Sequence, residues 1–77
     1  MYDVGRCLLA DKLKKAKMSQ QELANKLDVT KQQVNHYIHG RRIMNITIAK
    51  NIAYLLECEI DDLYEWVYVD ERKKRQK

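Results

Sequence analysis

One stretch of the sequence carries side chains suited to hydrogen bonding with the edges of nucleic-acid bases. Its polar residues are amides, histidines and a single lysine, namely Lys31, Gln32, Gln33, Asn35, His36 and His39. A side-chain amide can form hydrogen bonds to both N6 and N7 of one adenine, and Lys or protonated His can donate to guanine O6 and N7. No acidic residue occurs between Asp28 and Glu57, so this face can approach phosphates without repulsion. The pattern predicts a helix that enters the major groove of DNA. As a metal pair, His36 and His39 would lack a third ligand.

Two helix-start motifs must position this face. Both motifs are capping boxes, Ser19-Gln20-Gln21-Glu22 and Thr30-Lys31-Gln32-Gln33. In a capping box the hydroxyl of the first residue accepts a backbone N–H of the first helical turn, and the Glu or Gln side chain accepts the backbone N–H of that first residue. The two boxes predict a short helix after Ser19, a tight turn, and a second helix from Lys31 to about His39. We expect Asp28 to adopt a left-handed conformation in that turn, because Asp tolerates it better than most residues. These dimensions are those of a helix-turn-helix.

Periodic apolar residues and capping signals predict three further helices. The first covers residues 4–17 and turns Leu9, Leu13 and Ala16 inward, and the second covers residues 46–56 after an Asn45 cap. The third is short and begins with Glu59-Ile60-Asp61-Asp62. Gly40 is placed for a left-handed cap after the third helix. Strand signals are nearly absent, apart from a brief strand-like run over residues 67–69. The sequence therefore predicts an all-α fold, with one compact five-helix domain over residues 1–66 and an extended, basic and flexible tail over residues 67–77.

The composition fits this picture. The chain has 77 residues and a formal net charge of +4, which allows one domain and favours a polyanionic partner. Cys7 and Cys58 have no neighbours at metal-ligand spacing, so we expect them to serve as small apolar residues. No apolar run approaches the ~20 residues of a membrane helix, and no signal peptide is visible. We expect a cytoplasmic protein without a cofactor, metal or small-molecule substrate.

Residues 19–41 resemble the Cro/repressor (Xre-type) helix-turn-helix family. The matching features are Ser19-Gln20, Leu23-Ala24, Val29-Thr30, Val34, and Gly40 followed by a basic residue. The resemblance extends through Ile52-Ala53 and Leu56 to Glu59-Ile60-Asp61-Asp62-Leu63, and covers roughly residues 5–65. The sequence departs from the family at two turns, where Asp28 and Glu57 replace common glycines.

The resemblance implies a lambda-repressor-like domain that binds operator DNA as a two-fold dimer, with the third helix in the major groove. Carried over by position, the base readers are Lys31, Gln32 and His36, with Gln33 and Asn35 flanking them. The phosphate contacts are Ser19, Gln20, Thr30, Arg41 and Arg42. Helix N-termini and Arg side chains also suit phosphates on physical grounds.

The C-terminal segment is rich in apolar side chains, namely Tyr64, Trp66, Val67, Tyr68 and Val69. These residues either cover the core of one domain or form a homodimer interface, and we interpret them as the interface. The basic run Arg72–Lys77 either reaches DNA phosphates or is a solvated chain end.

These observations favour a sequence-specific repressor of phage, prophage or mobile-element origin that binds a palindromic operator as a dimer. From a chain of this length we expect no separate ligand-sensing domain. The alternative is an antitoxin or anti-repressor type of interaction protein, which would use the apolar C-terminal strip to bind another protein. An enzyme is disfavoured, because no carboxylate pair, nucleophile with a base, or phosphate-cradling glycine loop is present.

Overall fold

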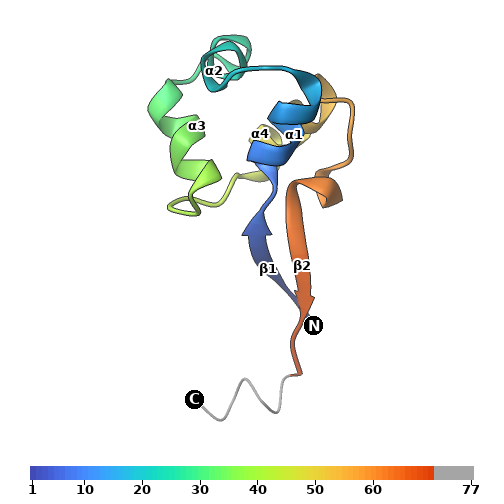
Figure 1. Cartoon of the computed structure of the whole chain (residues 1–77). Helices are drawn as coiled ribbons and strands as arrows, with labels where there is room; N and C mark the ends of the chain where they lie inside the picture. Colours follow the sequence, from blue (N-terminus) through green and yellow to red (C-terminus); the bar gives the residue numbers. More distant parts are fainter. Residues whose placement is uncertain (71–77) are drawn as a thin grey trace.

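A computed structural model of the protein describes residues 1–70, in which four α-helices gather into one body and a two-stranded ribbon projects from it (Figure 1). In chain order the elements are β1 (Tyr2–Cys7), α1 (Leu9–Ala16), α2 (Gln20–Leu27), α3 (Lys31–Ile38), α4 (Ile46–Leu55), the 3-10 helix η1 (Ile60–Leu63) and β2 (Tyr64–Tyr68). The predicted basic tail from Arg72 to Lys77 lies outside the described residues. No helix within residues 1–70 is long and apolar enough to cross a membrane.

The prediction of an all-α, five-helix fold is wrong at both ends of the domain. The first helix begins at Leu9 rather than Val4, because the preceding residues form β1. The fifth helix is the four-residue 3-10 turn η1, although it does carry Leu63 inward as predicted. The strand-like run near the C-terminus is part of β2. The partner of β1 lies some sixty residues away in the sequence, so local periodicity cannot reveal the pairing.

Strands β1 and β2 are antiparallel, and their register pairs Tyr2 with Tyr68, Val4 with Trp66, and Cys7 with Tyr64, with an irregularity between Val4 and Cys7. Gly5 lies in this irregular part. A Cβ at Gly5 would stand 2.8 Å from the Glu65 carbonyl oxygen, so a side chain there would push the strands apart. At the far end the Val69 N–H donates to the Met1 carbonyl at 2.7 Å.

The core lies between the four helices and the base of the ribbon. Its fully buried side chains are Leu9, Leu23, Val34, Ile52 and Leu63. Ala24 is also buried where α2 and α3 meet, and its small side chain allows the two helices to approach closely. Ala16 is exposed, so α1 presents a narrower apolar face than the sequence indicated. Apolar spacing therefore identified most of the helix faces that build the core.

All four α-helices end in the same backbone motif. A residue with positive φ follows each helix: Lys17 at 55°, Asp28 at 57°, Gly40 at 74° and Glu57 at 55°. The next N–H reaches back to a carbonyl five residues earlier, for example from Val29 to Ala24 at 3.0 Å. This is the Schellman arrangement, which usually places glycine at the left-handed position. The predictions for Asp28 and Gly40 are confirmed.

Candidate nucleic-acid interface

Both capping boxes are formed. The Ser19 hydroxyl accepts from the Glu22 N–H at 3.1 Å, and the Glu22 carboxylate accepts from the Ser19 N–H at 3.2 Å. Thr30 and Gln33 make the equivalent pair of bonds at 3.1 and 3.3 Å. Each hydroxyl still has its own proton to donate. The N-termini of α2 and α3 therefore combine free donors with the positive end of a helix dipole.

Helix α3 buries one face and exposes the other. Val34 and Tyr37 point into the core, while Lys31 and Gln32 are exposed. Gln33, Asn35 and His36 are half-buried. The structure thus brings the five predicted base readers together on one helix, with the most exposed ones in its first turn.

The side-chain amides differ in the groups they leave free. The Gln33 carbonyl oxygen accepts the Thr30 N–H, which leaves its NH₂ group to donate. The Asn35 NH₂ group makes a long, 3.5 Å contact to the Gln20 carbonyl oxygen and so links α3 to α2. The Gln32 side chain makes no hydrogen bond within residues 1–70. Gln32 is therefore the amide best placed to offer a donor and an acceptor together, which adenine recognition needs.

The loop after α3 carries the predicted phosphate-binding arginines. Gly40 lies in the left-handed conformation, and the Arg41 N–H donates to the His36 carbonyl at 2.9 Å. Arg41 and Arg42 are exposed, and neither forms an ion pair within residues 1–70. The glycine turn thus ends α3 and presents two uncompensated guanidinium groups beside it.

Comparison with known proteins agrees with this geometry. The helix-turn-helix family model matches residues 9–63, which include α1 to η1. The chain belongs to the Xre-type helix-turn-helix family of transcriptional regulators. One relative of this family member is an SPbeta prophage-derived uncharacterized HTH-type transcriptional regulator, YopS, from Bacillus subtilis (strain 168). The two are 34% identical over 65 residues, which covers 83% of this chain and 88% of the relative.

The predicted dimer strip of this Xre-type protein does not lie on one surface. Tyr64 is buried at the base of the ribbon, where its hydroxyl accepts the Met44 N–H at 3.1 Å. Burial raises the pKa of Tyr64, and burial likewise raises the pKa of the Cys7 thiol beside it. Trp66, Val67 and Tyr68 are exposed on β2, and Val69 is half-buried. That this strip binds a second chain stays a prediction.

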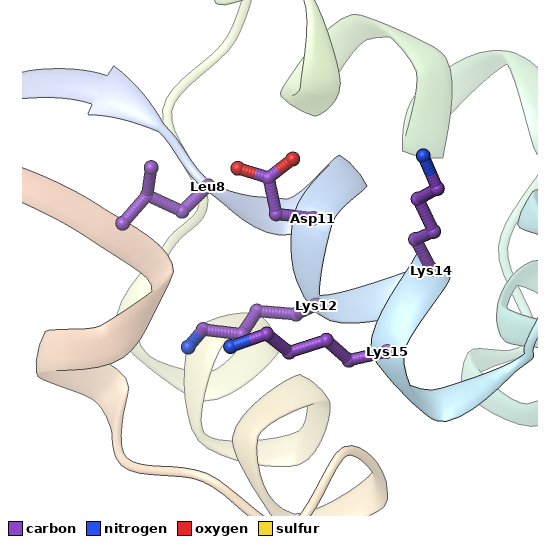
Figure 2. A pocket seen from close by; sticks show the side chains of 5 residues that line it. All are labelled: Leu8, Asp11, Lys12, Lys14 and Lys15. Atoms are coloured by element: carbon purple, nitrogen blue, oxygen red, sulfur yellow. The ribbon is translucent and has the colours of Figure 1, made fainter.

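Helix α1 of the Xre-type protein carries basic residues for which the sequence pattern predicted no specific role. An open hollow of about 600 Å³ is lined by Leu8, Asp11, Lys12, Lys14 and Lys15. Lys12 and Lys15 extend side by side, whereas Lys14 and Asp11 lie on the other side of the helix (Figure 2). No charged side chain within residues 1–70 is buried. These lysines therefore belong to the charged surface rather than to an enclosed ligand site.

Proposed function

We propose that this protein is a sequence-specific repressor of phage, prophage or mobile-element origin that binds a palindromic DNA operator as a dimer. The observation that carries the proposal is the acid-free outer face of α3, where Lys31 and Gln32 stand exposed beside a capped helix N-terminus. The name of the relative supports the prophage association. Helix α3 would lie in the major groove, as its amides and lysine suit base edges.

The base readers have separate tasks in this proposal. Gln32 offers donor and acceptor to one adenine, while Lys31 donates to guanine or to a neighbouring acceptor. Gln33 acts as a donor, because the Thr30 N–H occupies its carbonyl oxygen. Asn35 acts chiefly through its carbonyl oxygen, because its NH₂ group faces Gln20. His36 lies one turn beyond Gln32 and reads the adjacent base pair.

The phosphate contacts flank these readers. Ser19 and Thr30 donate their hydroxyl protons, since their oxygens already accept backbone N–H groups. The NH₂ group of Gln20 is free to donate, because only its carbonyl oxygen meets Asn35. Arg41 and Arg42 supply positive charge at the other end of α3. Such contacts set the position of the protein on DNA but carry no sequence information.

Paired substitutions test the division of roles. Gln32→Ala should weaken binding to a selected site by about 1–3 kcal/mol and relax base preference at one position, while non-specific binding is unchanged. Arg41→Ala should weaken specific and non-specific binding alike and lower the salt slope by about one. Titrations on both kinds of DNA at several salt concentrations separate the two classes. Identical behaviour of the two variants would show that the roles are misassigned.

The alternative is an antitoxin or anti-repressor type of protein whose main partner is another protein. The exposed aromatic side chains of the ribbon favour it. DNA affinity that does not respond to salt would support this alternative, because phosphate binding must weaken as salt rises.

A further inference from the structure

A small open hollow lies where the ribbon meets η1. Its volume is about 430 Å³, and it is lined by Tyr2 from β1, Asp61 from η1 and Trp66 from β2. Tyr2 pairs with Tyr68, which lies two residues from Trp66, so Tyr2 and Trp66 share one face of the antiparallel ribbon. The fold thus brings two aromatic rings and one carboxylate together from opposite ends of the chain.

Both rings of the hollow are held in place by their neighbours. The Trp66 indole N–H donates to the Asp61 carbonyl at 3.1 Å, and the Trp66 ring packs edge to face on Tyr64 with centroids 6.2 Å apart. Tyr2 packs in the same way against Tyr68, with centroids 5.4 Å apart. The rings remain open to a ligand, because Trp66 is 43% and Tyr2 70% exposed. A ligand would therefore meet rings that are already ordered, which lowers the entropic cost of binding.

The part of the chain that forms the hollow is acidic. No Lys or Arg occurs between residues 50 and 72. The acidic residues from the end of α4 to the middle of β2 are Glu57, Glu59, Asp61, Asp62 and Glu65. Asp61 is exposed, and its carboxylate forms no hydrogen bond or ion pair within residues 1–70. The hollow therefore offers an uncompensated negative charge beside two aromatic rings.

We propose that this hollow binds an arginine side chain of a partner protein. A cation over the face of an aromatic ring is attracted by the electrons of that face, and Trp attracts it most strongly. The planar guanidinium group stacks on such a ring and also donates two parallel hydrogen bonds to a carboxylate, here that of Asp61. Lysine carries a compact and strongly hydrated charge, so this combination of groups favours arginine. The same carboxylate would repel a DNA backbone.

The hollow and the proposed recognition helix lie on different sides of the molecule. In Figure 1, α3 is at the left of the helical body, whereas η1 and the start of β2 are at the right. An arginine bound beside η1 therefore leaves Lys31 and Gln32 of α3 free to meet DNA. A partner protein can then join the chain while it occupies an operator, and this step rests on the proposed function.

The fluorescence of Trp66 reports on this hollow alone, because the chain has one tryptophan. The full chain is titrated with acetyl-arginine amide and with the corresponding lysine and citrulline compounds, of which citrulline resembles arginine in shape but has no charge. Asp61→Asn removes the carboxylate of the hollow, and Tyr2→Leu removes the second ring. The matched control is Asp3→Asn, which removes the same charge from the opposite face of the ribbon. Circular dichroism checks that each variant folds.

The control substitution preserves the local structure. The Asp3 side chain accepts the Val4 N–H at 2.9 Å, and the carbonyl oxygen of an Asn side chain can accept the same bond. The Trp66 indole N–H bonds to the backbone carbonyl of Asp61 and not to its carboxylate. Both Asn variants should therefore keep their hydrogen bonds, so that they differ only in which charge is removed.

We expect the arginine compound to bind at least about three-fold more tightly than the lysine compound, and the citrulline compound to give no saturable change in emission. Asp61→Asn and Tyr2→Leu should each weaken arginine binding by about two- to five-fold, while Asp3→Asn stays within about 1.5-fold of the wild type. Equal binding of arginine and citrulline would overturn the proposal, as would equal affinities of Asp61→Asn and Asp3→Asn for arginine.

Other occupants of the hollow would give different results. A second copy of the chain would make the emission of Trp66 depend on protein concentration without any added compound. An arginine of the chain itself would make the probe bind more tightly to the full-length variant that combines Arg72→Gln with Arg75→Gln. Either result would overturn the assignment to a partner protein. Absence of DNA binding by the wild type would contradict the proposed function alone, because these titrations contain no DNA.

Discussion

Replacement of Glu57 by glycine should stabilise the domain. Glu57 follows α4 with φ of 55°, a left-handed conformation that costs a residue with a Cβ about 1–2 kcal/mol. Glycine escapes that cost but loses about 0.5–1 kcal/mol through the greater freedom of the unfolded chain. The backbone change alone should therefore yield a net gain of roughly 0.5–1 kcal/mol.

The charge of Glu57 adds a second contribution. A carboxylate at the C-terminal end of a helix faces the negative end of the dipole, which costs about 0.3–1 kcal/mol for an exposed side chain at low salt. Glu57 is exposed, so we take the lower part of that range. Glu57→Gln removes the charge but keeps the Cβ, and it therefore isolates the dipole contribution from the backbone contribution.

Thermal and urea unfolding measure both variants against the wild type. Glu57→Gly should raise the free energy of unfolding by about 1 kcal/mol, which corresponds to a rise in Tm of about 4–8 °C for a domain of this size. Glu57→Gln should gain about a third of that, and only at low salt. Gly40→Ala should lose about 1 kcal/mol for the backbone reason alone, since a Cβ there meets nothing within 4 Å. If Glu57→Gly were no more stable than Glu57→Gln, the reasoning about left-handed strain would be wrong.

Two further predictions concern the ribbon and the buried hydroxyl at its base. Gly5→Ala should loosen the pairing of β1 with β2, because the new Cβ would stand 2.8 Å from the Glu65 carbonyl oxygen. Amide hydrogen exchange should then become faster at ribbon residues such as Val69, while the amides of α3 stay protected. Unchanged exchange in the ribbon would contradict this prediction. Burial raises the pKa of Tyr64 above 10.0 and that of Cys7 above 9.0, so the folded state keeps protons that the unfolded chain releases. These two groups should leave stability unchanged well below pH 9 and should lower it as the pH rises through 9 and 10. Tyr64→Phe should make the upper part of this fall shallower, and an identical slope in urea titrations of both proteins would show that Tyr64 does not contribute.

Local chemistry allowed the centre of the fold to be predicted from the sequence. A capping box lies within four residues, so Ser19 and Thr30 marked the starts of α2 and α3 correctly. Gly40 and Asp28 marked two helix ends for the same local reason. The outward position of Lys31 and Gln32 then followed from helical periodicity, because Val34 and Tyr37 had to point inward.

Long-range pairing could not be predicted in the same way. Tyr2 and Val4 carry no signal of the partner strand some sixty residues away, so the ribbon was missed and the first helix was predicted too long. The apolar residues from Tyr64 to Val69 were recognised as unusual, but their division between a buried base and two ribbon faces depends on the register of pairing. The Asn35–Gln20 contact depends on the packing of α2 against α3, and no spacing in the sequence would indicate it.

Selection from a random duplex pool tests the central claim most directly. Purified full-length protein is used at near-physiological salt, and the enriched duplexes are footprinted. We predict enrichment of a short palindrome whose half-sites are about one helical turn apart or a multiple of it, with protection that Gln32→Ala relaxes at one base position. Recovery of random sequences, with affinity that vanishes at moderate salt, would contradict sequence-specific recognition by α3.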